Sequence, residues 1–202
     1  MTFTMATTLA VLGDSIAYGM GASKPSDTIG ARLAGELPDV ETRIFAVSGA
    51  DSRGLAAQVA AATAWAPDVA LIIIGANDLT HFVPSAQAAV LLGGAVRKLR
   101  KAGAEVVVVP APDLSVVPWC PPRMRLTVQA ASQLLRREQA VAATVAGARI
   151  ADISASAAAF AADPALFSAD RFHPSSEGYA VITAALAPAV RDAVAAGTGR
   201  GA

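Results

Sequence analysis

Ser15 is the residue in this sequence best placed to act as a nucleophile. It follows Gly13 and Asp14 in a short turn, directly after the apolar run Leu9–Leu12. A run of this length predicts a strand, and open α/β sheets bind their ligands beyond the carboxyl ends of the strands. Serine also occurs at such positions simply as a turn or helix-capping residue. The turn alone therefore allows both interpretations, and the partners of the hydroxyl must decide between them.

A serine that transfers acyl groups needs a base to take its proton and an acid to orient that base. The chain has two histidines, His81 and His173. A proline follows His173, which favours an extended backbone that presents the ring on a loop. Asp170 lies three residues earlier and can bind the imidazole Nδ1, which leaves Nε2 for Ser15. We therefore predict a Ser15, His173 and Asp170 triad, with Asp152 as the alternative acid because it lies at the end of a predicted strand and could reach the same edge.

The reaction also needs donors for the oxyanion that forms at the carbonyl. Gly49 leaves its backbone N–H unshielded, and the Asn77 side chain supplies an amide donor that a carboxylate could not replace. The N–H of Ser15 itself is the third donor. We predict that Ser15, Gly49 and Asn77 form an oxyanion hole, whereas Asp14, Asp78 and Asp113 are expected to anchor loops and His81 to lie at the surface.

The elements that must position these residues alternate along the chain. Short apolar runs predict strands at Thr8–Leu12, Arg43–Val47, Val69–Ile74, Glu105–Val109 and Arg149–Ile153. Alanine-rich segments of helical period predict helices at Thr28–Leu37, Arg53–Trp65, Ser85–Lys101, Leu126–Ala146 and Ser176–Ala195, the first capped by Ser26 or Asp27. This alternation favours a three-layer α/β/α sandwich with five parallel strands in the flavodoxin-like order 2-1-3-4-5. In that order the first and third strands are neighbours, so Ser15 and Asn77 face each other.

Two segments stay less regular in this prediction. Ala155–Ala169 is expected to hold a short helix and a loop. Asp113–Arg125 is the longest irregular stretch, and its part from Pro118 to Pro122 is a candidate pocket wall or lid. Trp119 and Cys120 within it fit either pocket lining or simple packing.

Composition narrows the class of protein. The chain has 202 residues, of which 54% are hydrophobic and 16% charged, so we expect one folded domain over residues 1–196 and a short tail at 197–202. Its formal net charge is zero, which excludes nucleic acid as a natural partner. The N-terminus lacks the basic region of a signal peptide, and no uncharged apolar stretch reaches 18 residues. We therefore expect a cytoplasmic protein without a membrane span.

Four blocks of residues together resemble the SGNH (GDSL-type) hydrolase family: Gly13-Asp14-Ser15, Gly49, Gly75-Ala76-Asn77-Asp78 and Asp170-Arg171-Phe172-His173. The resemblance spans nearly the whole chain in the right order, and the last block is its most specific part. It implies the flavodoxin-like sandwich, the same triad and oxyanion hole, and esterase or lipase chemistry on a small-molecule ester without a metal or cofactor. The second block departs from the family pattern, because Ser48 precedes Gly49 where many relatives carry asparagine.

The leading hypothesis is a serine esterase that hydrolyses a small or medium acyl ester through an acyl-enzyme. An O-acetyl esterase or acyltransferase acting on carbohydrate or lipid would use the same residues. A nucleotide-binding module is the alternative from a different class, suggested by Gly19-Met20-Gly21 after the first strand. Lys24 stands where a dinucleotide fingerprint needs its third glycine, which weighs against that alternative. The oligomeric state is not indicated.

Overall fold

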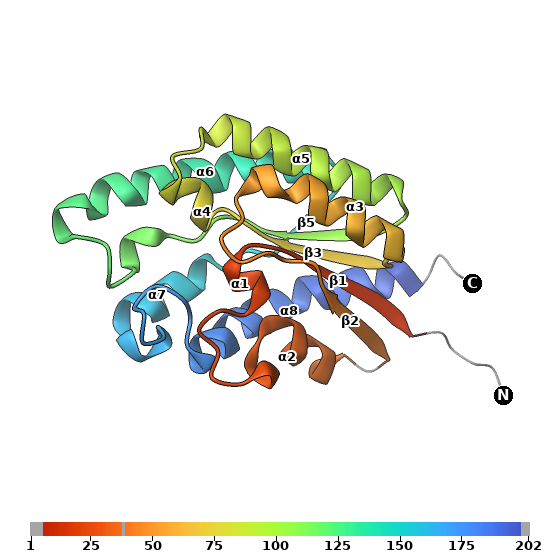
Figure 1. Cartoon of the computed structure of the whole chain (residues 1–202), viewed down its shortest axis with the longest axis horizontal. Helices are drawn as coiled ribbons and strands as arrows, with labels where there is room; N and C mark the ends of the chain where they lie inside the picture. Colours follow the sequence, from red (N-terminus) through yellow and green to blue (C-terminus); the bar gives the residue numbers. More distant parts are fainter. Residues whose placement is uncertain (1–5, 38, 199–202) are drawn as a thin grey trace.

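A computed structural model of the chain describes residues 6–37 and 39–198 (Figure 1). The strands are β1 (Thr7–Gly13), β2 (Val40–Ile44), β3 (Val69–Ile73), β4 (Glu105–Val109) and β5 (Arg149–Ile150). The helices are α1 (Ser15–Tyr18), α2 (Ile29–Glu36), α3 (Leu55–Trp65), α4 (Ala76–Thr80), α5 (Ser85–Lys101), α6 (Arg125–Val145), α7 (Ser154–Ala162) and α8 (Ser176–Thr198). Short 3₁₀ helices are η1 (Pro25–Asp27), η2 (Ser52–Gly54), η3 (Leu114–Val116), η4 (Pro122–Met124) and η5 (Pro164–Leu166).

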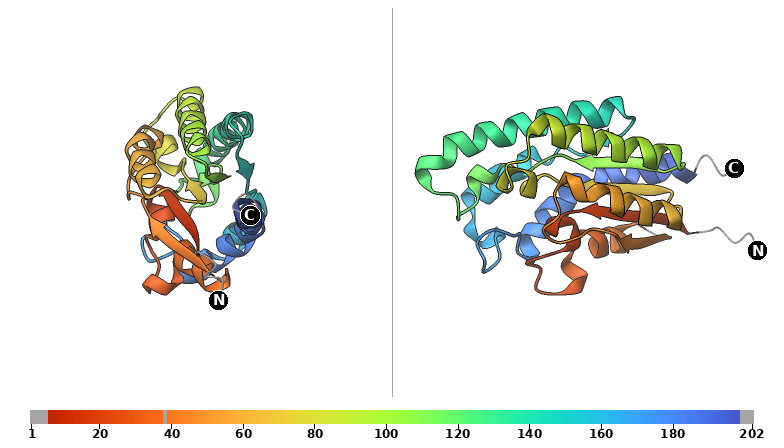
Figure 2. Two further views of the ribbon diagram at one scale, coloured as in Figure 1. Left: turned by 90° about the vertical axis from the view of Figure 1, so that its right-hand side faces the viewer. Right: turned by 45° about the horizontal axis from the view of Figure 1, so that its top comes forward.

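The five strands form one parallel sheet in the order β2-β1-β3-β4-β5, which confirms the predicted topology. Helices α3, α5 and α6 cover one face, and α2, α7 and α8 cover the other (Figures 1 and 2). Alternate residues of each central strand supply the two cores, as the pleat of a strand requires. Leu71 packs toward α2 and α8, for example, whereas its neighbour Ile72 packs toward α3 and α5.

The edge strands differ from the prediction. β2 covers Val40–Ile44 rather than Arg43–Val47, because its ladder with β1 starts where Thr7 pairs with Val40. The residues after Ile44 bend over the end of β1, where the backbone N–H groups of Phe45 and Ala46 both donate to the Val11 carbonyl. β5 is shorter than expected, since Asp152 already accepts a hydrogen bond from Ser154 N at 2.8 Å at the start of α7.

Two helix ends also differ slightly from the prediction. Thr28 caps α2 through its hydroxyl, which accepts from Ala31 N at 3.4 Å, so neither Ser26 nor Asp27 is the cap. α8 continues to Thr198, beyond the expected end at Ala195, and the predicted tail is helical at its first two residues. The rest of that tail lies outside the described residues.

Among the described residues, α8 is the one helix long and apolar enough to span a membrane by length and composition, although the sequence analysis expected none. One face of α8 lies in the core: Tyr179, Leu186 and Val190 have no exposed surface and pack with apolar residues of β1, β3 and β4. A helix that packs in a protein core also needs many apolar residues, so length and apolar composition do not distinguish it from a membrane-spanning helix.

Candidate active site

The turn that carries Ser15 is fixed by its neighbours at the carboxyl end of β1. A Cβ on Gly13 would lie 1.8 Å from the Ile73 carbonyl oxygen, and Gly13 has φ +134°, so no other residue fits here. The buried amide of Gln58 clamps Gly13 on both sides, accepting from its N–H at 2.7 Å and donating to its carbonyl at 2.9 Å. Asp14 then caps α1, accepting from Ile16 N at 3.0 Å. Ser15 is therefore held rigidly as the first residue of a short helix.

The structure brings Ser15, His173 and Asp170 together in one hydrogen-bonded chain. The Nε2 atom of His173 lies 2.9 Å from the Ser15 hydroxyl, and its Nδ1 lies 2.6 Å from Asp170 Oδ2. This is the arrangement in which a histidine can take a proton from serine while a carboxylate orients the ring.

Asp170 is itself tightly held in its loop. Its Oδ1 atom accepts hydrogen bonds from the Ser168 hydroxyl and from the backbone N–H groups of Phe172 and His173, at 2.8 to 2.9 Å. Burial alone would raise the pKa of Asp170, but these bonds and the His173 ring outweigh it and hold the pKa well below its ordinary value. The carboxyl group is therefore ionised beside the ring. Arg171 has φ +61°, which lets the loop turn back between Asp170 and His173.

The alternative acid, Asp152, lies elsewhere. Its carboxylate accepts from Ser154 N at the start of α7, and no contact with His173 occurs within the described residues. Asp78 and Asp113 accept backbone hydrogen bonds from Ser52 and Ser115 and so anchor loops, as expected.

The predicted oxyanion donors come from three loops at the same sheet edge. Ser15 is the first residue of α1, so its N–H has no acceptor within the helix. Gly49 has φ +82°, and a Cβ there would meet no atom within 4 Å, so conformation rather than crowding requires glycine. Asn77 lies in the first turn of α4, and its Nδ2 donates one hydrogen to the Ala50 carbonyl at 2.9 Å. The second amide hydrogen is left for another acceptor.

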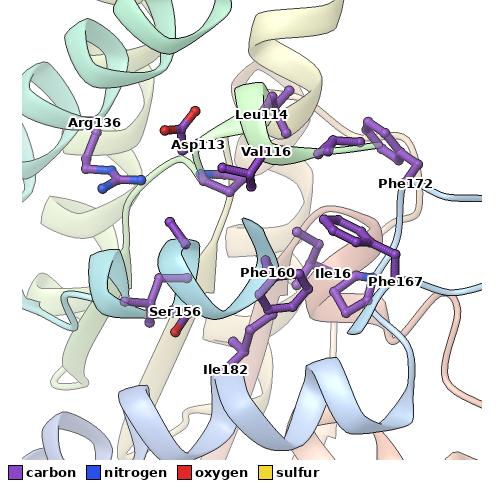
Figure 3. Close-up of a pocket in the computed structure, with 15 residues that line it drawn as sticks. Ile16, Asp113, Leu114, Val116, Arg136, Ser156, Phe160, Phe167, Phe172 and Ile182 are labelled. Atoms are coloured by element: carbon purple, nitrogen blue, oxygen red, sulfur yellow. The ribbon is translucent and has the colours of Figure 1, made fainter. Parts of the chain in front are cut away.

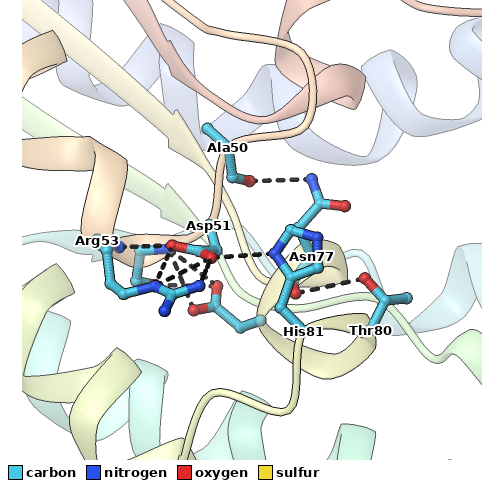
Figure 4. A network of polar contacts seen from close by, with 8 residues as sticks. Ala50, Asp51, Arg53, Asn77, Thr80 and His81 are labelled. Atoms are coloured by element: carbon cyan, nitrogen blue, oxygen red, sulfur yellow. Dashed lines mark hydrogen bonds and ion pairs between the residues drawn. The ribbon is translucent and has the colours of Figure 1, made fainter.

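A polar network that was not predicted from the sequence ties the Gly49 loop to the end of α4 (Figure 4). The Asp51 carboxylate binds the Arg53 side chain, and its Oδ2 lies 3.0 Å from His81 Nδ1. The Arg53 hydrogen bond is the main reason that the pKa of Asp51 lies well below its ordinary value. His81 follows the last residue of α4 and is exposed, as predicted, but its ring also contacts Asp51. The only sequence signal was three consecutive polar residues at 51–53.

The glycines that suggested nucleotide binding have a different use. Gly21 has φ +90°, and a Cβ there would lie 2.5 Å from the Pro174 carbonyl oxygen. The Tyr179 hydroxyl donates to the Met20 carbonyl at 2.7 Å. This loop therefore packs against the segment that carries His173, and close approach explains its glycines.

An apolar pocket (Figure 3) is lined in part by residues that are chain neighbours of Ser15 and His173. Ile16 follows Ser15, Phe172 and Pro174 flank His173, and all three line the pocket. Its cavity volume is about 70 Å³. Further lining residues come from η3, α6, α7 and α8, among them Val116, Arg136, Phe160 and Ile182. Trp119 and Cys120, for which the sequence left pocket lining and simple packing both open, are not among the residues that line this pocket.

Asp14 predicts a measurable dependence of stability on pH. Burial raises its pKa from 3.8 to about 6, and the backbone N–H groups of Ile16, Ala76 and Gly75 offset only part of that effect. Unfolded Asp14 ionises near 3.8, so the folded protein binds more protons between about pH 4 and 6. The contribution of Asp14 to stability therefore falls as pH rises through that window.

The Asp14→Asn variant tests this directly, because every other titrating group is shared with the wild type. We expect the unfolding free energy of the wild type to fall by about 2 kcal/mol relative to Asp14→Asn between pH 4 and 7. Urea unfolding across this range measures the difference. A difference that stays constant with pH would show that Asp14 ionises normally in the fold.

The class of protein follows from the fold and the family comparison together. A three-layer sandwich of this strand order, with a serine turn after β1, is the architecture of the SGNH hydrolases. The profile of the GDSL-like Lipase/Acylhydrolase family matches residues 11–181, and the chain belongs to this family of carboxylic-ester hydrolases. The resemblance stated from the sequence is thereby confirmed.

A relative of known family agrees with this assignment, and two solved structures share the fold. A GDSL-like esterase of Mycobacterium tuberculosis is 36% identical over 195 residues, which cover 92% of this chain and 62% of the relative. The chain thus spans less than two thirds of that relative's length. The solved structure of TesA has a TM-score of 0.76 at 24% identity, covering 92% of this chain and 99% of TesA. A catalytic mutant of Axe2, an acetylxylan esterase from Geobacillus stearothermophilus, has a TM-score of 0.74 at 18% identity, covering 94% and 96% of the two chains.

Proposed function

We propose that this protein hydrolyses carboxylic esters of small or medium acyl groups through an acyl-enzyme on Ser15. The observation that carries the proposal is the hydrogen-bonded chain from Ser15 through His173 to Asp170, with contacts of 2.9 and 2.6 Å. A serine hydroxyl is a weak nucleophile at its own pKa and needs this kind of adjacent base.

In the first half of the reaction, His173 Nε2 takes the Ser15 proton as Oγ attacks the carbonyl carbon of the ester. The negative charge that develops on the carbonyl oxygen is stabilised by the N–H groups of Ser15 and Gly49 and by the Asn77 amide. Asp170 stabilises the imidazolium that forms. His173 then gives the proton to the leaving alcohol, and the acyl group stays on Ser15.

In the second half, a water molecule repeats these steps. His173 takes a proton from the water, which attacks the acyl carbonyl while the same three donors hold the oxyanion. Collapse of this intermediate breaks the bond to Ser15, whose oxygen recovers its proton from His173. The products are a carboxylic acid and a free enzyme, and no cofactor enters the balance.

The apolar pocket supports acyl groups of limited length. Burial of each methylene contributes about 0.8 kcal/mol, so kcat/KM is expected to rise up to about fourfold per methylene until the pocket is full. With p-nitrophenyl esters, we expect rates to rise from acetate to butyrate or longer chains and to fall for palmitate. Rates that increase steadily to palmitate would contradict an acyl pocket of limited depth.

A pair of neighbouring alanines on α7 provides the matched variants for this panel. Ala157 lines the pocket, whereas Ala158 is exposed and does not. Ala157→Leu should shift the preferred ester toward shorter acyl chains, and Ala158→Leu should leave the profile unchanged. If neither variant moves the profile, the acyl group binds elsewhere.

The second candidate function is the removal of acetyl groups from carbohydrate. The observation that favours it is the similarity of fold to Axe2, which is an acetylxylan esterase. Acetylated xylooligosaccharides added to the same panel distinguish the two functions. Turnover of these substrates with no turnover of longer p-nitrophenyl esters would replace the leading proposal with this one.

A further inference from the structure

The segment Trp119–Leu126, which leads into α6 and begins it, exposes apolar and basic side chains at nearby positions of the chain. Leu126 is 82% exposed, Trp119 68% and Met124 42%, and Arg123 and Arg125 are exposed between them. We call these five residues the basic apolar tip. Large apolar side chains this exposed are unusual when several lie together, and such groups mark interaction sites.

The charge of this region has one sign. Residues 114–137 contain four arginines and no aspartate or glutamate, although the whole chain is neutral. A local positive field of this kind attracts an anionic surface. The two arginines of the tip, Arg123 and Arg125, flank Met124. Positive charge and apolar surface therefore lie in the same short segment.

The basic apolar tip lies at one end of the molecule, away from both chain termini. The first turns of α6 and the loop before them project beyond the neighbouring helices in both side views (Figures 1 and 2). The tip is also close to the candidate active site. The rings of Trp119 and Phe172 pack edge to face with centroids 6.4 Å apart, and Phe172 lines the acyl pocket.

We propose that the basic apolar tip docks on the surface of an anionic lipid bilayer. Aromatic and aliphatic side chains insert at the level of the headgroups, and neighbouring arginines bind the anionic lipids. Docking by this end brings Trp119 to the bilayer, and Trp119 packs against Phe172 of the pocket lining. The substrate class is then esters dissolved in the membrane. This substrate class rests on the proposed function, but docking itself does not depend on it.

Binding is measured with vesicles of phosphatidylcholine and with vesicles that also contain roughly 30% phosphatidylglycerol, which gives an anionic surface. Trp119 is the natural probe, and a Trp65→Phe background removes the other tryptophan. We expect the Trp119 emission to shift to shorter wavelength with anionic vesicles and sedimentation of the protein with them. No shift and no sedimentation at low salt would overturn the proposal.

Removal of charge from the tip tests the role of the arginines. Each arginine near an anionic surface strengthens binding about fivefold, so Arg123→Gln/Arg125→Gln should weaken vesicle partition roughly 25-fold. The matched control is Arg97→Gln/Lys98→Gln, which removes the same charge from exposed positions near the far end of α5. Equal loss in both variants would mean that net charge, not the tip, drives binding.

The apolar contribution has its own matched pair on α6. Met124→Ser/Leu126→Ser should reduce partition at least roughly tenfold while Trp119 remains as the probe. Val141→Ser/Val145→Ser changes exposed apolar residues near the other end of the same helix and should have no effect. If the two pairs weaken binding equally, the tip is not the docking surface.

The inactive Ser15→Ala variant separates this inference from the proposed catalytic function. It should bind anionic vesicles as tightly as the wild type, because Ser15 lies outside the tip. Binding without any ester hydrolysis by the wild type would leave docking intact and reject the esterase proposal. Hydrolysis of soluble esters without vesicle binding would support the esterase proposal and reject docking.

Discussion

Replacement of Ser15 by alanine is expected to lower kcat for ester hydrolysis by about 10⁶-fold, as loss of the nucleophile does in other serine hydrolases. The variant keeps the oxyanion donors and the pocket, so substrate binding should change little. The fold should also survive, because the substitution removes one oxygen from a residue whose backbone is held by Asp14 and by the Gly13 clamp.

The measurement is a rate on the best p-nitrophenyl ester, with circular dichroism and thermal unfolding as checks of the fold. Ser26→Ala serves as the matched control, since Ser26 is an exposed serine away from His173. It should keep full activity. If Ser15→Ala retained more than about 1% of the wild-type rate, Ser15 would not be the nucleophile.

Replacement of His173 by alanine is the second large effect, again about 10⁶-fold in kcat. Without the imidazole, the Ser15 proton has no acceptor at 2.9 Å, and the ionised Asp170 loses its ring partner. The other histidine is the matched control. His81 contacts Asp51 and not Ser15, so His81→Ala should cost no more than about tenfold.

The double variant tests whether the two residues act as one unit. Groups that share one proton transfer are strongly non-additive, so Ser15→Ala/His173→Ala should be no slower than either single variant. Losses that multiply would show that His173 acts independently of Ser15.

The central strands of the sheet could be predicted from the local pattern of apolar residues. The β-branched run at Val69 and the run at Glu105 are typical of strands because both faces of a central strand are buried, and both strands lie where predicted. The edge strands were misplaced because they depend on register with a neighbour. β2 begins at Val40 only because Thr7 pairs there, and no local signal encodes that contact.

As with the fold, part of the candidate site could be predicted from the sequence and part could not. Ser15, His173 and Asp170 stood out because their chemistry and loop context are visible in the sequence, and the fold brings them together. The supporting contacts were not visible. Gln58 lies inside an alanine-rich helix, and its clamp on Gly13 across 45 positions depends on how α3 packs against β1.

The residues that line the pocket could not be predicted either, because they too depend on tertiary packing. Phe160 and Ile182 belong to different helices that meet only through tertiary packing, so their approach to the site cannot be read from either segment. Trp119, by contrast, was a candidate for the pocket, and it lies exposed at the tip instead.

Covalent labelling with a fluorophosphonate tests the assignment of Ser15 as nucleophile most directly, because this reagent reacts with an activated serine and mimics acylation. The labelled protein is digested, and mass spectrometry locates the modified residue. We predict one label on Ser15, no label in the His173→Ala variant, and loss of ester hydrolysis in proportion to labelling. Active protein that stays unlabelled at Ser15, or that carries the inactivating label on another residue, would contradict this assignment.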